Sequence, residues 1–388
     1  MTATNETASA EPTIHGTCKP EFEAVKAAFR TNFTDHGDVG ASVCVSLNDE
    51  VVVDLWAGAR DGKTNEPWLE DTIVNVYSTT KTMAAACLLL LADRGELDFE
   101  ERVAHYWPEF AAEGKADVRV KHLMAHSAGL SGMETPATAE QVYDWDFMVR
   151  ALAAQAPWWE PGSQSGYHAL TQGFLQGEVL RRITGQSLGT FFRKELAEPL
   201  GADFYIGTPL KHHARIGTLV PPKAPPASGA GDPDSIAART FRNPAINARD
   251  SRTAAWREAE IPAANGHGNA RSVVAVQALF ANGGVSQGKR LLSEAGVERL
   301  FEEQISGRDL VLGVPLRFGM GYGLSSTVMP MGPNKRIAYW GGWGGSSIVI
   351  DADARLCVSY VMNRMEAGLM GDPRGFSLLQ AAYETILI

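Results

Sequence analysis

The sequence predicts an α/β (α+β) fold in which helices flank an antiparallel sheet and a mainly helical lobe is inserted into the chain. Apolar runs of strand length lie near both ends of the chain, at 41–56 and at 337–362. The long segment between them has mostly helical periodicity, broken by loops. We therefore expect one sheet that the C-terminal segment completes. The predicted sheet domain comprises residues 20–83 and 266–388, and the mainly helical domain comprises residues 84–265.

The N-terminal part of the chain supplies the first strands of this sheet. Residues 1–19 are expected to form a disordered tail, and a helix follows from Pro20 to Phe33. The segments Ala41–Leu47 and Val51–Trp56 are apolar runs, and Asn48-Asp49-Glu50 joins them as a hairpin connection. These two strands are therefore expected to pair.

The next predicted strand leads directly into an apolar helix. The strand, Ile73–Tyr77, stops at Ser78-Thr79-Thr80, and the helix continues to Arg94. Gly95 then serves as its C-cap. Ser78 thus stands where a strand changes into a helix.

The remaining elements belong first to the helical lobe and then to the sheet again. Within the lobe, Gln172–Thr184 and Leu188–Leu196 are the clearest helices. The segment Leu219–Asp234, rich in proline and glycine, predicts an irregular surface loop. The later expected elements are the helix Ser272–Ala281, the strands Ile337–Trp340, Ser347–Ile350 and Leu356–Met362, and the final helix Gly375–Ile386.

Charge and hydropathy exclude two classes of partner. Lys and Arg number 35 against 45 Asp and Glu, a net charge of −10, whereas duplex binding needs a basic face. The longest apolar run, Met83–Ala92, is far shorter than the roughly 20 residues that span a bilayer. The four cysteines are far apart and form no CxxC, which favours a reduced, cytoplasmic setting. No cofactor is predicted, and the oligomeric state is left open.

Two short motifs are discounted because their context is wrong. The segment 185–189 (GQSLG) matches the G-x-S-x-G nucleophile elbow, but the elbow needs a preceding strand and residues 178–184 have helical periodicity. Gly185 is then a helix C-cap, and Ser187 caps the next helix. His122 and His126 have the spacing of a zinc helix, but Leu123 replaces the glutamate and no third ligand is suggested. No metal site is predicted.

The segment Ser78-Thr79-Thr80-Lys81 is the stronger chemical signal. If Ser78 opens the helix, Lys81 lies one turn later on the same face and reaches the Ser78 hydroxyl. A helix N-terminus also offers unpaired backbone N–H groups to a developing oxyanion. Alone, the motif favours the simpler interpretation of a capping serine with a solvated lysine.

Two other segments favour a catalytic role for Ser78 over a capping role. Residues 157–162 (PWWEPG) lead into Gly166-Tyr167-His168, an aromatic loop that carries a tyrosine. Residues 339–346 (YWGGWGGS) open a strand with four glycines. Glycine weakens a strand unless a ligand or backbone must approach closely, so these segments indicate a site at the junction of the two lobes.

Together, these segments resemble the serine β-lactamase and penicillin-recognising superfamily, and most closely its esterase branch, the family VIII carboxylesterases. The likeness covers nearly the whole chain, from about Pro20 to Ile388, and implies a β-lactamase-like fold with the active site between the lobes. Its further markers are the segments 54–58 (DLWAG), 122–130 (HLMAHSAGL), 166–170 (GYHAL), 263–271 (AANGHGNAR) and 360–365 (YVMNRM).

The resemblance implies a role for each residue that matches a family motif. Ser78 matches the nucleophile, Lys81 its paired base, and Tyr167 the tyrosine that completes the site. Trp340-Gly341-Gly342 takes the place of the third motif, usually Lys-Thr-Gly in β-lactamases. Trp343 would then join Ser78 in offering backbone N–H groups to the oxyanion. Which of Lys81 and Tyr167 is the general base stays open.

Departures from the family pattern bear on the substrate. Trp340 cannot hold a substrate carboxylate as the lysine of that motif does, and Tyr167 lacks the Tyr-x-Asn amide because Ala169 stands there. Both changes disfavour penicillins and D-Ala-D-Ala peptides and favour a small, uncharged ester with a short acyl chain. Candidates for the substrate pocket are Trp340, Gly341, Gly342, Trp158, Trp159, Phe241, Tyr322, Tyr339 and His168.

Other functions remain in competition with a serine carboxylesterase that forms a Ser78 acyl-enzyme. A β-lactam, amide or D-peptide hydrolase, or an acyltransferase with an alcohol acceptor, would use the same residues. A catalytically silent binding protein of the same fold is the alternative outside enzymes, because fold alone does not fix function.

Overall fold

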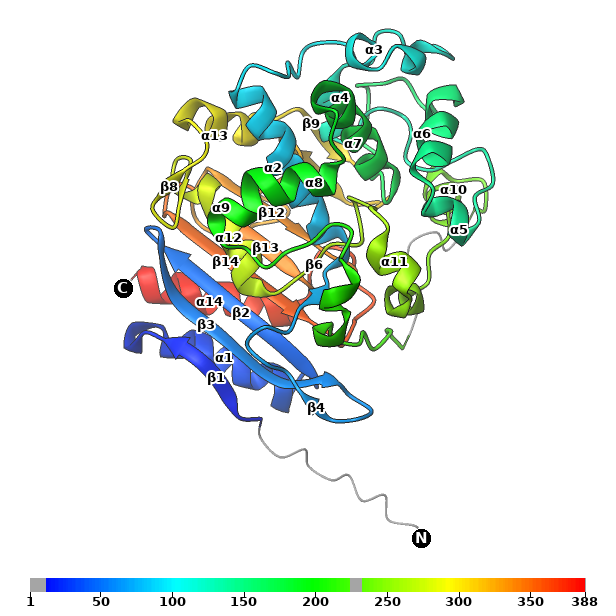
Figure 1. Cartoon of the computed structure of the whole chain (residues 1–388). Coiled ribbons are helices and arrows are strands. Elements are labelled where there is room, and N and C mark those ends of the chain that lie inside the picture. The colour runs from blue at the N-terminus through cyan, green and yellow to red at the C-terminus, as the bar shows by residue number, and fades with distance from the viewer. Residues whose placement is uncertain (1–11, 224–231, 388) are drawn as a thin grey trace.

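The sheet is assembled from both ends of the chain. The computed structural model describes residues 12–223 and 232–387. Its main sheet has ten strands, paired antiparallel in the order β1-β3-β2-β14-β13-β12-β11-β10-β9, with β4 paired to β3 (Figure 1). The bounds are β1 Ile14–Cys18, β2 Gly40–Leu47, β3 Glu50–Asp61, β4 Glu66–Pro67, β9 Ile305–Arg308, β10 Pro315–Phe318, β11 Gly323–Leu324, β12 Ile337–Gly341, β13 Ser347–Asp351 and β14 Leu356–Met362. The predicted antiparallel sheet, completed by C-terminal strands, is confirmed.

The central strands are buried on both faces. β2 and β14 pair along their whole length, with Val43 opposite Tyr360, and nearly every residue of both strands is buried. Their sequences are therefore almost continuously apolar instead of alternating, as is usual when helices cover both faces of a sheet.

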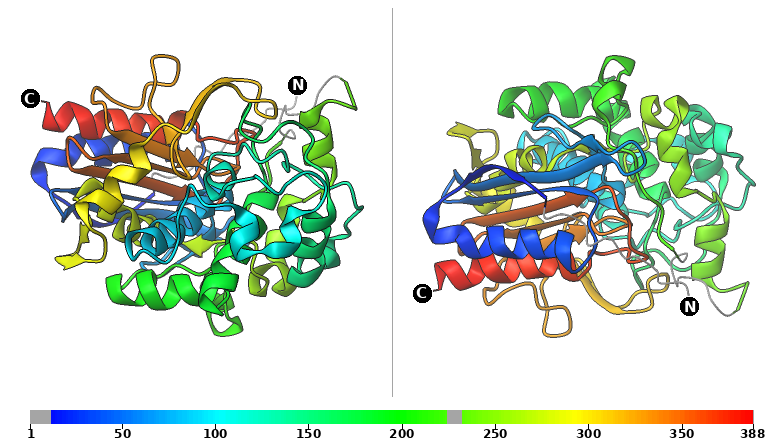
Figure 2. Two further views of the ribbon diagram at one scale, coloured as in Figure 1. Left: turned by 90° about the horizontal axis from the view of Figure 1, so that it is seen from above. Right: turned by 90° about the horizontal axis from the view of Figure 1, so that it is seen from below.

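Helices cover the two faces of the sheet. α1 (Glu23–Thr34) and α14 (Pro373–Ile386) lie side by side on one face (Figure 2). α12 (Ala270–Ala281) covers the other face, where it contacts β2, β13 and β14. α2 (Thr80–Asp93) packs against α12 and against helices of the inserted lobe, so residues 80–91 are buried all round. A helix that is apolar on every side belongs in a core.

The inserted lobe consists mostly of short helices. It occupies the upper right of Figure 1 and is joined to the sheet through α2. Within the described residues, no helix combines the length and the apolar character needed to cross a membrane. The remaining helices are α3 Val103–Tyr106, α4 Val120–Met124, α5 Ala139–Val142, α6 Trp145–Ala154, α7 Thr171–Thr184, α8 Leu188–Phe192, α9 Glu198–Leu200, α10 Ile236–Arg242, α11 Ala254–Glu258 and, beside α2, α13 Glu294–Phe301.

The expected disordered tail contains a strand. β1 lies within the first 19 residues and pairs with β3 in full register, with Gly16 opposite Leu55. Its polar sequence, IHGTC, is largely exposed at the edge of the sheet and lacks the apolar alternation that predicts a strand. Residues 1–11 and, within the predicted surface loop, residues 224–231 lie outside the described residues. The division into two domains stays a prediction.

Of two other expected elements, one is shorter than predicted and one is helical throughout but changes helix type. The strand before Ser78 is only β5 (Val74–Asn75), which pairs with β6 (His267–Gly268) outside the main sheet. The helix from Leu188 ends at Phe192 and continues as a π-helical turn, Arg193–Ala197. In contrast, Gly185 does cap α7 with a left-handed backbone, and the Ser187 hydroxyl caps α8, as predicted.

A buried ion cluster lies at the start of α14. The guanidinium of Arg374 donates to Asp372, to Asp38 Oδ1 at 2.6 Å, and to the carbonyls of Arg364 and Gly344 at 2.9 and 2.7 Å. All five N–H groups of this side chain therefore have an acceptor, while only 1% of Arg374 is exposed. Because its partners come from four separate segments, the cluster fixes the start of α14 against the end of β14 and the loop at Gly344.

Replacing Arg374 is expected to destabilise the fold strongly. Arg374→Gln leaves Asp38 and Asp372 buried without their counter-charge, which costs about 3–5 kcal/mol. Urea unfolding followed by circular dichroism measures the loss. Arg336→Gln is the control, because Arg336 pairs with Glu298 and Asp353 at the surface. That change is expected to cost less than about 1 kcal/mol, and equal losses in the two variants would contradict the prediction.

Candidate active site

Ser78 lies in a tight turn at the start of α2. Residues Tyr77–Thr79 form a 3-10 turn that runs into the helix, and Tyr77 has a left-handed backbone with φ of 43°. The Thr80 hydroxyl donates to the Tyr77 carbonyl and accepts the N–H of Gly266 at 2.9 Å. A bulky residue in the left-handed region is strained, so these bonds hold the turn that presents Ser78.

Lys81 is buried beside Ser78 and has only uncharged partners. Its Nζ lies 3.1 Å from Ser78 Oγ, 2.7 Å from the Ala169 carbonyl oxygen and 2.9 Å from the Ala263 carbonyl oxygen. Lys81 as a whole is 2% exposed, and burial lowers the pKa of its amine well below the ordinary value for lysine. The site therefore favours the neutral amine over the ammonium ion.

Tyr167 approaches Ser78 from the inserted lobe. Its hydroxyl donates to Ser78 Oγ at 2.5 Å, and the Lys81 Nζ lies 4.7 Å from the centre of its ring. Burial raises the pKa of Tyr167 above the ordinary value for tyrosine, and the bond to Ser78 opposes this only in part. The phenol therefore stays protonated. The structure thus brings Ser78, Lys81 and Tyr167 together, although they lie up to 89 residues apart.

Two aromatic rings pack against the ring of Tyr167. The ring of Trp340 lies 5.5 Å from the ring of Tyr167, and the ring of His126 lies 5.0 Å from it. His126 also stacks on Trp340 at 5.9 Å. Trp340 is 2% exposed and acts as a support for the tyrosine, so it occupies its motif position without lining the cavity described below.

The glycine-rich loop 341–346 packs directly onto the serine turn. The Ser346 hydroxyl donates to the Val76 carbonyl at 2.8 Å and lies 2.9 Å from the Thr79 hydroxyl. Gly342 donates its N–H to the Ser346 carbonyl at 2.8 Å, and a Cβ atom on Gly342 would overlap the Val76 carbonyl and the Ser346 hydroxyl. Only glycine lets the loop approach so closely. Among the described residues, neither Ser78 nor Trp343 pairs its backbone N–H with another backbone group.

A cavity of about 250 Å³ opens at Ser78. Ser78 and Tyr167 lie in its wall, and no lining residue carries a charged side chain. The polar Thr240 is occupied, because its hydroxyl pairs with Ser131 Oγ at 2.6 Å and with the Ile236 carbonyl at 2.7 Å. The other lining residues are Tyr77, Ala169, Leu170, Phe241, Pro244, Ile246, Ala264, Trp343 and Leu369. The cavity is therefore small and apolar.

Of the nine predicted pocket residues, only Phe241 lies in this wall. Trp340, Gly341 and Gly342 do not line it, and the other five serve elsewhere. Tyr322 is buried under α2, where its hydroxyl donates to the Thr82 carbonyl and pairs with Gln277. The ring of Tyr339 is likewise buried, and a Cβ atom on Gly323 would come 3.0 Å from it. Neither reaches the cavity, because both belong to the core.

The other predicted pocket residues brace the loops around the site. The Trp158 ring stacks under the Arg239 guanidinium at 4.0 Å, and Trp159 donates its indole N–H to the Gln164 carbonyl at 2.9 Å. His168 pairs its Nδ1 with the Gly166 carbonyl at 2.6 Å and accepts the Leu130 N–H on Nε2 at 3.1 Å. Burial lowers the pKa of His168 to about 3, so it is a neutral structural histidine.

Sequence reasoning missed several residues around the site. Pro244, Ile246 and Leu369 come from loops whose apolar residues have no periodicity, so the sequence contains no signal for them. His126 was considered only as a zinc ligand, yet its Nδ1 accepts the N–H of His168 at 3.0 Å. The Ser187 hydroxyl donates to Glu260 Oε1 at 2.6 Å, which agrees with a structural role for that serine.

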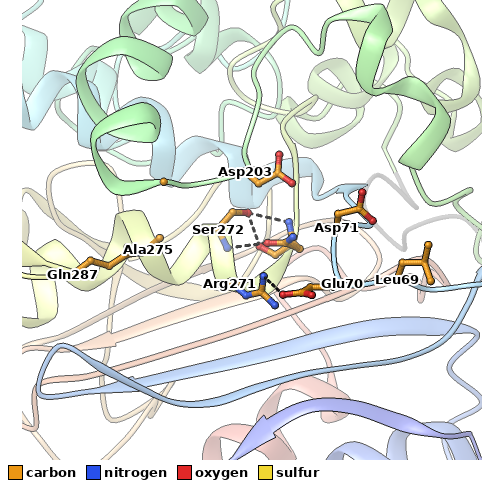
Figure 3. A pocket seen from close by; sticks show the side chains of 10 residues that line it. Leu69, Glu70, Asp71, Asp203, Arg271, Ser272, Ala275 and Gln287 are labelled. Atoms are coloured by element: carbon orange, nitrogen blue, oxygen red, sulfur yellow. Dashed lines mark hydrogen bonds and ion pairs between the residues drawn. The ribbon is translucent and has the colours of Figure 1, made fainter.

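A second, larger hollow is not part of this site. It has a volume of about 490 Å³, and Figure 3 shows Glu70, Asp71, Asp203 and Arg271 at its wall. Arg271 pairs with Asp54 and with Glu70 at 3.3 Å, while Asp203 pairs with Arg215. The charges of Arg271, Glu70 and Asp203 are therefore already paired, and Ser78, Lys81 and Tyr167 do not line this hollow.

Comparison with known proteins places the chain in a family. The Beta-lactamase family model matches residues 25–382. This chain belongs to the β-lactamase family. A solved family VIII carboxylesterase is 42% identical to it, with a TM-score of 0.90 and coverage of 96% of this chain and 100% of that one.

Two further relatives cover nearly the whole chain. A penicillin-binding protein homologue from Caulobacter crescentus is 38% identical, with a TM-score of 0.90 and coverage of 96% of this chain and 100% of that chain. Esterase/beta-lactamase LipL of Mycobacterium tuberculosis is 35% identical over 377 residues, which are 94% of this chain and 86% of that protein. The predicted β-lactamase-like fold and the predicted enzyme class, a serine hydrolase, are confirmed.

Gly342 gives a direct test of the contact between the glycine-rich loop and the serine turn. In Gly342→Ala the new methyl group displaces the loop and with it the N–H of Trp343. On the expectation from the family resemblance that the Trp343 N–H is an oxyanion donor, kcat for p-nitrophenyl butyrate falls about 10²-fold or more, the usual cost of losing one such donor. Gly217→Ala is the control, because its new Cβ meets no atom closer than 3.5 Å. Unchanged kcat in a folded Gly342→Ala variant would contradict the prediction.

Proposed function

We propose that this protein is a serine carboxylesterase that hydrolyses small, uncharged carboxylic esters through an acyl-enzyme on Ser78. The observation that carries the proposal is the position of Ser78 Oγ, 3.1 Å from Lys81 Nζ and 2.5 Å from the Tyr167 hydroxyl, at an apolar cavity. The relatives named esterase and carboxylesterase support the same reaction class.

In the proposed acylation, Lys81 is the general base. A neutral lysine has two N–H donors and one lone pair. If the carbonyls of Ala169 and Ala263 accept the two N–H groups, the lone pair is left for the Ser78 hydroxyl. Ser78 then transfers its proton to Lys81 as its oxygen attacks the ester carbonyl carbon. Burial, which disfavours the ammonium form in the free enzyme, supports this assignment over Tyr167 as base.

Tyr167 acts as the proton donor in this scheme. The tetrahedral intermediate collapses to the serine ester, the C–O bond to the alcohol breaks, and Tyr167 protonates the departing alkoxide. In the scheme Lys81 then returns its proton to Tyr167, whose ring centre lies 4.7 Å from Nζ. In deacylation, neutral Lys81 accepts a proton from the water that attacks the acyl-enzyme, and Tyr167 protonates Ser78 Oγ as the acid leaves. A second proton return from Lys81 to Tyr167 restores the site.

Two backbone groups are proposed to stabilise the oxyanion. The N–H groups of Ser78 and Trp343 have no other backbone acceptor among the described residues, and the bonds of Ser346 hold their two segments together. Such donors typically supply about 10²–10³ in rate each, because they are oriented before the charge develops.

The size and the lining of the cavity favour a substrate with an uncharged and short acyl group. Its volume lies below the range of about 300–1,000 Å³ that is usual for drug-sized ligands. Its wall has no cation to pair with the carboxylate of a β-lactam or a D-peptide, since Trp340 stands at the usual lysine position and stacks on Tyr167. An apolar acyl chain, by contrast, replaces water in such a cavity at no electrostatic cost.

The setting of the enzyme is part of the proposal. Cys18, Cys44, Cys87 and Cys357 are free, which agrees with a reduced, cytoplasmic location. The net charge of −10 disfavours nucleic acid as a partner, so the proposed partner is the ester substrate alone.

The first experiment compares the wild type with Ser78→Ala in the hydrolysis of p-nitrophenyl butyrate. The proposal expects turnover by the wild type and none by the variant, because the acyl-enzyme cannot form without Ser78 Oγ. Circular dichroism shows that the variant is folded. Equal activity in both proteins would exclude Ser78 as the nucleophile, and Ser187→Ala serves as the matched serine control.

The pH dependence of kcat/KM distinguishes the two possible bases. Lys81 must be neutral to accept a proton, so activity is lost as the pH falls through its pKa and rises as the pH increases through it. Because burial lowers that pKa, the acid limb is expected well below the ordinary lysine value of about 10.4. If Tyr167 were the base, burial would place the limb above the ordinary tyrosine value of about 10 instead. A profile between about pH 5 and pH 9 decides between them.

A further inference from the structure

The backbone N–H of Tyr167, in the inserted lobe, donates to the carboxylate of Asp309, which lies next to the main sheet. Asp309 follows β9 and is 1% exposed. Its Oδ1 atom accepts three backbone N–H groups, those of Val311 and Leu312 at 2.9 Å each and that of Tyr167 at 3.0 Å. The first two bonds close the turn between β9 and β10. The third reaches 142 residues back along the chain to the tyrosine.

A second bond fixes the same turn to the same segment. Leu310 donates its N–H to the Ser165 carbonyl at 2.9 Å. Asp309 itself is fixed within the hairpin, since its N–H donates to the Val314 carbonyl at 3.0 Å and its carbonyl accepts from Gly313 at 2.9 Å. The turn is therefore rigid, and the segment at Tyr167 packs against it.

Other elements fix the residues on either side of Tyr167. Gly166 donates its N–H to the His126 carbonyl at 2.9 Å, and His168 donates its N–H to His126 Nδ1 at 3.0 Å. Of the three consecutive N–H groups, only that of Tyr167 depends on Asp309. The Asp309 carboxylate therefore controls the orientation of the peptide N–H of Tyr167, the one residue of the three whose side chain reaches Ser78.

The carboxylate also keeps a negative charge near the phenol. Oδ2 of Asp309 is buried and has no hydrogen-bond partner among the described residues. Burying such an oxygen costs stability, so its presence needs an explanation. The charge of Asp309 adds to the effect of burial in raising the pKa of Tyr167. It therefore disfavours a tyrosinate and favours a phenol that donates.

We propose that Asp309 is a positioning residue of the active site, whose carboxylate sets the Tyr167 hydroxyl on Ser78 Oγ through the backbone N–H of Tyr167. The inference rests on the proposed function in one respect, namely that Tyr167 moves a proton during turnover. A small rotation of the peptide at Tyr167 is magnified at the far end of its side chain. Misplacing a catalytic group by about 1 Å costs about 10²-fold in rate.

Three substitutions at Asp309 separate the effect of its hydrogen bond to Tyr167 from the effects of its turn hydrogen bonds and of its charge. Asp309→Asn keeps an oxygen for the three N–H groups and removes the charge. Asp309→Ser keeps a hydroxyl that can close its own turn, as serine does in ST turns, but is too short to serve Tyr167 as well. Asp309→Ala removes every acceptor. If Asp309→Ala does not fold, Asp309→Ser still tests the link to Tyr167 alone.

Asp351→Ala is the matched control. Asp351 is also a buried aspartate, and its Oδ1 accepts two turn N–H groups, those of Asp353 and Ala354 at 3.0 and 2.9 Å. It lies at the end of β13 remote from Ser346 and the serine turn. A loss of activity that follows only from destabilising the fold would appear in this variant too.

Steady-state hydrolysis of p-nitrophenyl butyrate gives the first readout. We expect Asp309→Ser to lower kcat about 10²-fold with KM changed less than about threefold, and Asp309→Asn to restore kcat to within about tenfold of the wild type. In a double-mutant cycle, Asp309→Ser is expected to have no further effect on kcat in a Tyr167→Phe background. Additive losses in the cycle, or an equal loss in Asp351→Ala, would overturn the inference.

A crystal structure of Asp309→Ser gives a readout that does not depend on the substrate. The inference expects the Tyr167 hydroxyl to lie beyond hydrogen-bond distance, more than about 3.5 Å, from Ser78 Oγ. A separation still near the 2.5 Å of the wild type overturns it. A wild type without esterase activity, or an active Ser78→Ala variant, counts against the proposed function, and this structure then decides on Asp309 by itself.

Discussion

The burial of the Lys81 amine is the constraint on which the rest of the site depends. An ammonium ion in that position would need a carboxylate, yet its neighbours are Ser78 Oγ and the carbonyls of Ala169 and Ala263. The two carbonyls belong to the tyrosine loop and to the segment that leads into β6. A single nitrogen atom therefore joins the serine turn to two other parts of the chain, and each must be in place for the amine to be both buried and bonded.

Two neighbouring residues of the glycine-rich loop, Trp343 and Gly344, face an uncharged cavity and a cluster of charges respectively. At Gly344 the loop meets Arg374, Asp372 and Asp38, a cluster of full charges with nearly all donors used. At Trp343 it meets the cavity, whose wall carries no charge. Such a buried ion cluster adds little to stability relative to well-packed apolar residues, but losing one of its partners is costly. The cluster thus keeps the loop in one position while the reacting side stays apolar, where uncharged groups of the substrate replace water.

Many elements of the fold were predictable from the sequence because they depend on local pattern, whereas the central site was predicted from the resemblance of its motifs to a known family. The apolar runs of β2 and β14 and the serine at the start of α2 follow from periodicity and from the spacing between Ser78 and Lys81. By contrast, β1 is a polar edge strand that pairs with β3, with Ile14 opposite Ala57, and β9–β11 are strands of two to four residues, so none of them shows a clear periodicity.

The cavity wall and the contacts behind it could not be predicted in this way. Tryptophans near the motifs suggested a pocket, but Trp158 and Trp159 brace the loops, and Tyr322 lies in the core. Asp309 carries no motif, because its importance comes from a bond to a residue 142 positions away. Chemistry that lies within one helical turn is visible in a sequence, whereas tertiary contacts between loops are not.

The pairing of β2 with β14 has a consequence for how an active molecule is made. Ser78 and Lys81 are present once α2 has been synthesised, but β14, one of the two partners of β2, comes late in the chain. A chain that leaves the ribosome therefore holds β2 with an open edge until β14 appears, and pairings over such sequence distances form slowly. Synthesis must be almost finished before the glycine-rich loop can pack on the serine turn, so a partly made chain holds Ser78 and Lys81 without the rest of the site.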